Sequence, residues 1–240
     1  MKKKITLSII IVLILSLIGG AVYYINDYYR AEEVAVSLIT TPKENVKVTE
    51  ENGVFTFKPQ NATKAVIFYP GGKVEAKAYA PLMYALAEDG ILGVIVTMPA
   101  NLAVLDMDAA EGIQEKYPEI KSWYMAGHSL GGSMAASYIA ENSKDFDGII
   151  LLASYSTADL SNSNLDVLSI YGSNDGVLNM EKYEECKTNL PNDFSESVID
   201  GGCHAFFGAY GEQDGDGKAT ITRDEQIEIT VNEILQFINN

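Results

Sequence analysis

Residues 127–132, with the sequence GHSLGG, contain a serine that could act as a nucleophile. The preceding residues 122–126 are predicted to form a short strand, and residues 133–141 a helix rich in alanine and methionine. A sharp turn between a strand and a helix lifts a serine hydroxyl above the end of a sheet, and flanking glycines leave room for neighbouring backbone. The pattern therefore predicts that Ser129 is a nucleophile and not part of an ordinary glycine turn.

A serine nucleophile needs a general base, usually histidine, and the chain contains two histidines. His128 is adjacent to Ser129 in sequence, so its side chain should point away from the hydroxyl. His204 lies on a loop directly after a predicted strand at residues 194–199. We therefore expect His204 to be the base.

The third group required is a carboxylate that fixes the tautomer of the histidine and stabilises the imidazolium. Asp175 is the best candidate, because it follows a predicted strand at residues 167–171 in a turn marked by glycines. The chain order is then serine, aspartate, histidine. This order is typical of α/β hydrolases and differs from that of other serine hydrolase folds.

With these residues in this order, residues 64–238 resemble the α/β-hydrolase superfamily, most closely its small members without a cap, which are dienelactone-hydrolase-like or carboxylesterase-like. The resemblance implies hydrolysis of a small-molecule acyl substrate, a carboxylic ester or related compound, through an acyl-enzyme and without a cofactor. It also implies an oxyanion hole formed by the backbone N–H groups of Gly72 and Leu130. Pro70-Gly71 replaces the family's usual His-Gly pair, which leaves Lys73 as a possible substitute for Gly72.

Strands and helices alternate along the rest of the chain, which predicts an α/β fold with a mostly parallel sheet and helices on both faces. Further strands are predicted at residues 65–69, 92–97 and 148–152, and helices at 76–89, 106–116, 180–188 and 223–238. Ligands bind such sheets at the carboxyl ends of the strands, where all three candidate side chains fall. Residues 153–165 are too few for a lid of several helices. An open pocket that favours short acyl groups is therefore expected.

Lysines at positions 2, 3 and 4 precede an apolar run from Ile5 to Ile25, which predicts an N-terminal transmembrane helix. A cleaved signal peptide is the alternative, but no small-residue cleavage site follows the run. The positive-inside rule would keep the lysine cluster in the cytoplasm. The expected location is therefore the cell membrane, in a single pass, with the catalytic domain outside the cytoplasm.

These features predict three regions of the chain. Residues 1–30 would form the membrane anchor with its cytoplasmic lysine cluster, and residues 64–240 the α/β-hydrolase catalytic domain. Residues 31–63 would form a tether and a β-hairpin, because Asn52-Gly53 lies between two predicted strands at 46–49 and 54–57.

The net charge of −16 at pH 7 repels nucleic acid, so no nucleic-acid partner is expected. The oligomeric state is left open. Cys186 and Cys203 could pair outside the cell, but two free, mostly buried thiols are favoured. Residues 213–225 partly match a calcium-binding loop, but Lys218 stands at a ligand position and Ala219 replaces the required glycine, so no metal is expected.

Two alternatives to ester hydrolysis remain open at this stage. An acyltransferase would use the same three side chains and the same acyl-enzyme, with an acceptor other than water. A noncatalytic binding or scaffold protein could retain the fold without the chemistry, since a fold alone does not establish a function.

Overall fold

The computed structural model describes residues 2–43 and 45–240, with only the backbone described for residues 2–11. Its strands are β1 (Val46–Glu51), β2 (Val54–Pro59), β3 (Lys64–Tyr69), β4 (Leu92–Val96), β5 (Ser122–His128), β6 (Gly148–Leu152), β7 (Asp166–Gly172) and β8 (Ser195–Ile199). Its α-helices are α1 (Lys2–Asn26), α2 (Glu33–Thr40), α3 (Ala80–Glu88), α4 (Leu130–Glu141), α5 (Met180–Cys186) and α6 (Arg223–Asn239). Short 3-10 turns occupy several of the connections.

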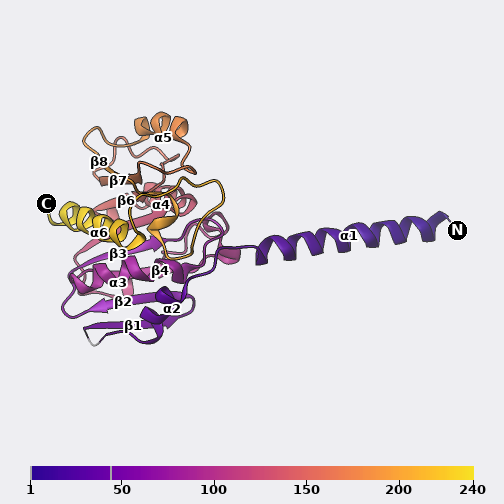
Figure 1. Ribbon diagram of the computed structural model, residues 1–240, viewed down its shortest axis with the longest axis horizontal. Helices are drawn as coiled ribbons and strands as arrows, with labels where there is room; N and C mark the ends of the chain where they lie inside the picture. The colour runs from indigo at the N-terminus through magenta and orange to yellow at the C-terminus, as the bar shows by residue number, and fades with distance from the viewer. Residues whose placement is uncertain (1, 44) are drawn as a thin grey trace.

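The strands form one sheet in the order β1-β2-β4-β3-β5-β6-β7-β8 (Figure 1). In this order, each pair of neighbouring strands from β4 to β8, with β3 among them, is parallel. The pairs β1–β2 and β2–β4 are antiparallel. The predicted mostly parallel sheet is therefore confirmed. The predicted hairpin is also present: Asn52 and Gly53 both have positive φ, at 51° and 77°, as a two-residue hairpin turn requires. Because β2 pairs with β4, this hairpin extends the main sheet.

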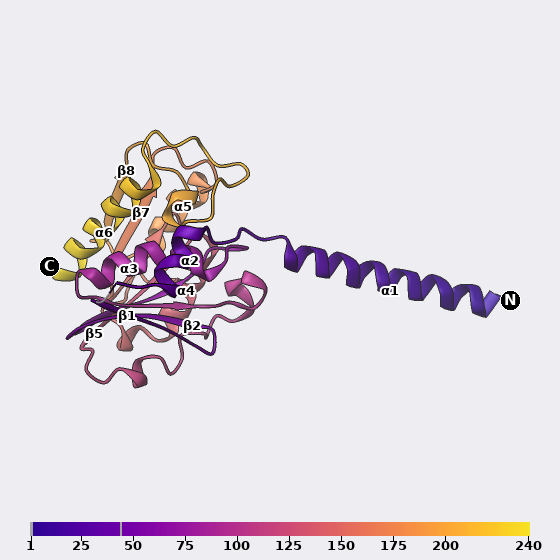
Figure 2. The ribbon, with the colours of Figure 1, turned by 60° about the horizontal axis from the view of Figure 1, so that its bottom comes forward.

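The sheet is covered on both faces, because successive side chains of a strand point to opposite sides. In β3, Val66 and Phe68 pack into one apolar cluster with residues of α2, α3 and α6. Ala65 and Ile67 pack into a second cluster with residues of α4 and of the loop after β4. Strands buried on both faces are continuously apolar, which explains sequences such as VIFY and GIILL. Figure 2 shows the layers from a second direction.

Helix α1 projects away from the sheet and its covering helices (Figures 1 and 2). Among the described residues, no helix has both the length and the apolar character needed to cross a bilayer. The predicted N-terminal transmembrane helix is therefore wrong. Met1 and the side chains of the predicted lysine cluster lie outside the described residues.

The helix predicted over residues 106–116 is also wrong. This segment consists of turns that end in a single 3-10 turn at Gln114–Lys116, and Gly112 has a φ of 72°. The hydroxyl of Tyr69, at the end of β3, donates to Met107 O at 2.6 Å and accepts from Ala110 N at 3.0 Å. The Tyr69 hydroxyl thus forms hydrogen bonds with a backbone carbonyl and a backbone amide that would pair with each other's neighbours inside an α-helix.

Candidate active site

Ser129 occupies the sharp turn between β5 and α4, with φ 53° and ψ −125°. Such a conformation is unfavourable for a residue with a side chain, and it persists only where surrounding structure enforces it. Here Ser129 N donates to Leu152 O at 2.9 Å, which extends the ladder between β5 and β6. A Cβ atom on Gly127 would lie 2.6 Å from the carbonyl carbon of Gly131, so only glycine fits. The local geometry is that of a nucleophile elbow.

His204 and Asp175 lie side by side at the carboxyl ends of β8 and β7. His204 Nδ1 is 2.8 Å from Asp175 Oδ2, and both side chains are only 1% exposed. The second carboxylate oxygen of Asp175 accepts the backbone N–H groups of Val177 and Leu178, each at 2.8 Å. The carboxylate is thus fixed on both oxygens. Nδ1 of His204 donates to it, and Nε2 is left as the basic nitrogen.

Ser129 and His204 border one cavity of about 220 Å³. The other lining residues are Leu130, Ser133, Ala153, Ser154, Tyr155, Val177, Leu178 and Asn179. Nε2 of His204 is buried and has no hydrogen-bond partner in the described part of the chain. Hydrogen bonds between a catalytic base and its nucleophile are often long without a ligand and tighten when substrate binds. The structure thus brings the three predicted side chains to one edge of the sheet.

Two backbone amides lie beside the serine. Leu130 is the first residue of α4, and the first amides of a helix have no partner within it. Gly72 lies against Leu130, since a Cβ on Gly72 would be 3.0 Å from Leu130 Cδ2. The N–H of Lys73 already donates to Asn101 O at 2.8 Å. No acceptor for the Gly72 N–H occurs among the described backbone hydrogen bonds. Of the two candidate donors, Gly72 and Lys73, it is therefore Gly72 whose N–H is available to an oxyanion.

A second histidine packs against the site, which sequence reasoning did not predict. The His128 ring lies 4.5 Å from the His204 ring between centroids. Its Nδ1 is 2.8 Å from the hydroxyl of Tyr79, which accepts from Gly71 N at 3.0 Å. The Tyr79 hydroxyl therefore donates its own hydrogen to Nδ1 of His128, which is the acceptor. Burial, and then the nearby charge of His204, hold the pKa of His128 well below its ordinary value, so this imidazole is neutral.

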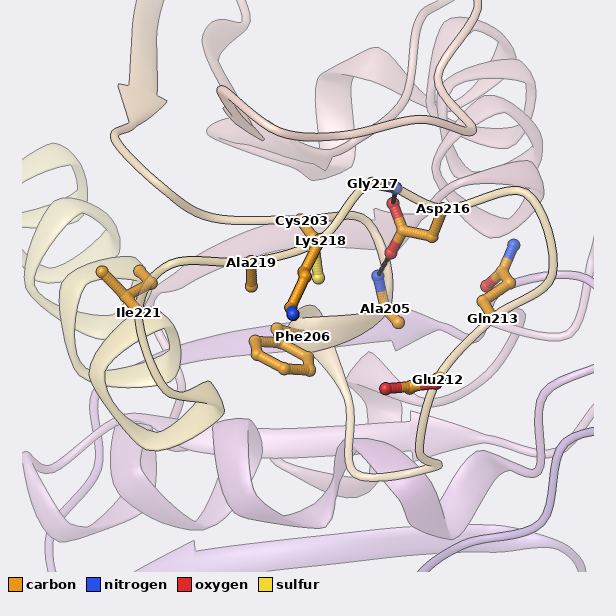
Figure 3. Close-up of a pocket in the computed structure, with 10 residues that line it drawn as sticks. All are labelled: Cys203, Ala205, Phe206, Glu212, Gln213, Asp216, Gly217, Lys218, Ala219 and Ile221. Carbon is orange, nitrogen blue, oxygen red and sulfur yellow. Dashed lines mark hydrogen bonds between the residues drawn. The ribbon is translucent and has the colours of Figure 1, made fainter.

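Asp216 was also missed as a site residue. One of its oxygens accepts from His204 N at 3.1 Å and Gly176 N at 3.1 Å. The other accepts from Ala205 N at 2.8 Å (Figure 3). Burial raises the pKa of Asp216, but these amides outweigh that effect and the pKa lies below its ordinary value. The carboxylate thus ties the backbone beside Asp175 to the backbone of His204. The signal in the sequence was an acidic turn, which gave no indication of these distant partners.

Asp216 also lines a larger cavity, of about 430 Å³ (Figure 3). Cys203 contributes to its lining, and Cys186 is the last residue of α5. Both cysteines are free thiols. Burial raises the pKa of Cys203 to about 12, so it remains a protonated thiol at neutral pH.

The fold and this edge of the sheet define the class of protein: a doubly covered parallel sheet that presents a serine elbow, with a histidine and a carboxylate on later strands. A family model described as "Alpha/beta hydrolase family" matches residues 65–228. The chain belongs to the α/β hydrolase family, which confirms the resemblance predicted from the sequence.

Solved structures with the same fold include two with enzymatic names. "Ferulic Acid bound to Est1E from Butyrivibrio proteoclasticus" has a TM-score of 0.60 and 14% identity, and the match covers 82% of this chain and 98% of that chain. A dienelactone hydrolase from Anabaena variabilis has a TM-score of 0.60 and 12% identity, with 81% and 99% covered.

A third similar structure, TT1662 from Thermus thermophilus, has a TM-score of 0.59 and 12% identity, with 81% and 99% covered. At these identities the similarity concerns the fold. No curated protein matches the sequence closely enough to add to the comparison.

Proposed function

We propose that this protein hydrolyses carboxylic esters of small molecules, with Ser129 as nucleophile, His204 as general base and Asp175 as the group that orients the histidine. The observation that carries the proposal is the 2.8 Å hydrogen bond between His204 and Asp175, buried beside the cavity that His204 shares with Ser129. The esterase and dienelactone hydrolase with this fold support the same reaction class.

The reaction would begin when His204 Nε2 accepts the hydroxyl proton of Ser129 and the serine oxygen attacks the ester carbonyl carbon. The negative charge that develops on the carbonyl oxygen would be met by the amides of Gly72 and Leu130. Nε2–H would then donate its proton to the leaving alkoxide, which yields an acyl-enzyme on Ser129. Water, deprotonated by the same nitrogen, would attack the acyl carbon and release the acid.

The size of the cavity favours a short acyl group. The space beside Ser129 is about 220 Å³, below the range of about 300–1,000 Å³ for pockets that enclose drug-sized ligands. Residues 153–165, between β6 and β7, contain no helix that could cover the entrance. Esters with acetyl or propionyl groups are therefore expected to react faster than long-chain esters.

The test is the reaction of the full chain with a fluorophosphonate probe and with p-nitrophenyl acetate. Wild type should be labelled and should release p-nitrophenol, and Ser129→Ala should do neither. Ser137→Ala is the matched control, because Ser137 lies on the same helix and its hydroxyl donates to Ser133 O. Folded wild type that is not labelled would refute catalysis and favour a scaffold role. Product found only as a new ester of an added alcohol would favour acyl transfer.

A further inference from the structure

Residues 27–32, which connect α1 to α2, cross the carboxyl edge of the sheet beside the candidate site. We call this segment the strap. Tyr29 pairs with Val74 as an isolated bridge: Tyr29 N donates to Lys73 O at 2.8 Å, and Glu75 N donates to Tyr29 O at 2.9 Å. The strap is thus bound to the loop that follows β3. This loop also carries Gly72.

The turn that contains Gly72 is held in an unfavourable conformation. Val74 N donates to Gly71 O at 3.2 Å, which places Gly72 and Lys73 at the centre of the turn. Lys73 has a φ of 59°, in the left-handed region where glycine or asparagine is preferred at this position. A lysine stays in that region only when surrounding contacts enforce it.

The strap supplies two of the contacts that restrain Lys73. Besides the bond from Tyr29 N to its carbonyl, the Lys73 ammonium lies 2.7 Å from the carboxylate of Asp27. The third restraint is the bond from Lys73 N to Asn101 O. The hydrogen bond to Asp27 raises the pKa of Lys73, which keeps the ammonium charged. Removal of the strap would take away two of these three restraints on Lys73 and leave its backbone N–H bonded to Asn101 O.

The strap also binds the loop that follows His204. The hydroxyl of Tyr29 accepts from Asp214 N at 3.1 Å, and its ring packs on Tyr210 at 5.6 Å between centroids. Glu32 N donates to Ala209 O at 2.8 Å. Tyr29 therefore contacts both the Gly72 turn and the loop of the candidate base.

We infer that Tyr29 is a positioning residue for the oxyanion hole: through the strap it holds the Gly72 turn in register with the histidine loop. This inference rests on the proposed function, because it assigns the Gly72 amide to the oxyanion. Tyr29 touches neither Ser129 nor His204 in any described hydrogen bond or ring contact, so its effect is transmitted by the two loops.

The experiment compares Tyr29→Ala with Tyr28→Ala in the full chain. Tyr28 is also half-buried in the strap, but its hydroxyl accepts from Arg30 Nη1 and contacts neither loop through a described hydrogen bond. Loss of one oxyanion donor costs about 100-fold or more in kcat. Displacement of the donor should cost less, so we expect Tyr29→Ala to lower kcat for p-nitrophenyl acetate about 10-fold, with KM within about twofold. Tyr28→Ala should leave both constants unchanged.

Two further measurements separate positioning from general stabilisation. Backbone amides of residues 71–75 should exchange hydrogen faster in Tyr29→Ala than in wild type or Tyr28→Ala. Both backbone bonds of Tyr29 persist in either variant, and Tyr29→Ala removes the ring from Tyr210 and the hydroxyl from Asp214 N. Tyr29→Phe keeps the ring on Tyr210 and should therefore recover most of the kcat. Equal kcat in both alanine variants at a temperature where both are folded, or unchanged exchange at 71–75, would overturn the inference. If the proposed function itself fails, wild type does not react with fluorophosphonate, which is a different outcome.

Discussion

The two histidines of this chain are buried to the same extent and their rings lie 4.5 Å apart between centroids, yet their Nδ1 atoms face different partners. Nδ1 of His204 faces the carboxylate of Asp175, and Nδ1 of His128 faces the phenol of Tyr79, both at 2.8 Å. The carboxylate stabilises a protonated ring and leaves Nε2 free to accept a proton. The phenol carries no charge, because burial raises its pKa. The chemical nature of the partner, and not burial, distinguishes a candidate base from a structural histidine.

The largest expected effect comes from removing the charge that makes His204 different. Asp175→Asn keeps the shape of the site but favours the wrong tautomer of His204, a change that lowers kcat by about 10⁴-fold in a serine protease. We expect a loss of that order in the hydrolysis of p-nitrophenyl acetate, with thermal unfolding measured alongside. Asp166→Asn, at the exposed start of the same strand, is the control and should be fully active. More than a tenth of wild-type activity in Asp175→Asn would mean that the two histidine environments do not differ in function.

A smaller effect is expected from the partner of His128. Tyr79→Phe leaves the N–H of Gly71 and Nδ1 of His128 without partners in a buried place. An unsatisfied buried group costs about 1–3 kcal/mol, so the free energy of unfolding in urea should fall by that amount. Tyr138→Phe is the control, because no described hydrogen bond involves its hydroxyl. Equal stability of the two variants would show that the phenol contributes nothing to the His128 environment.

The smallest effect is the pH dependence that the neutral His128 creates. Its pKa is lowered on folding mainly by burial, so the unfolded chain binds a proton at higher pH than the folded chain does. The free energy of unfolding should then be fully retained above pH 6.5 and decline as pH falls, by at most about 2 kcal/mol between pH 6.5 and 5. His128→Asn, which does not titrate, should show a shallower decline in urea unfolding at these pH values. An identical decline in wild type and variant would assign it to the carboxylates instead.

Much of the candidate site was predictable because its signals are local. Ser129, Asp175 and His204 each follow a strand that the sequence predicts from its apolar residues. Parallel strands bring their carboxyl ends to one edge of the sheet, so the three residues meet there. The roles of Tyr79 and Asp216 were not predictable, since each depends on loops that meet only in the folded chain. Nothing in the sequence near either residue marks its partners.

The errors in the fold have the same origin. The acidic, alanine-containing stretch at 106–116 is compatible with a helix, but the hydroxyl of Tyr69 bonds its backbone from the sheet. Local propensity is a weak prior that tertiary contacts override. The apolar composition of the run at the start of the chain predicts a membrane span, but no described helix meets the requirements for one.

The connection between β6 and β7 contains no helix, which bears on the fate of an acyl group attached to Ser129. Enzymes that hand a reactive intermediate to a chosen acceptor must keep bulk solvent away from it. In this chain the cavity beside the serine lies under a helix-free segment and is partly open at its mouth. We expect bulk water, the most concentrated acceptor available, to reach the ester carbon through this opening, so turnover should end in a free acid even when alcohols or amines are present.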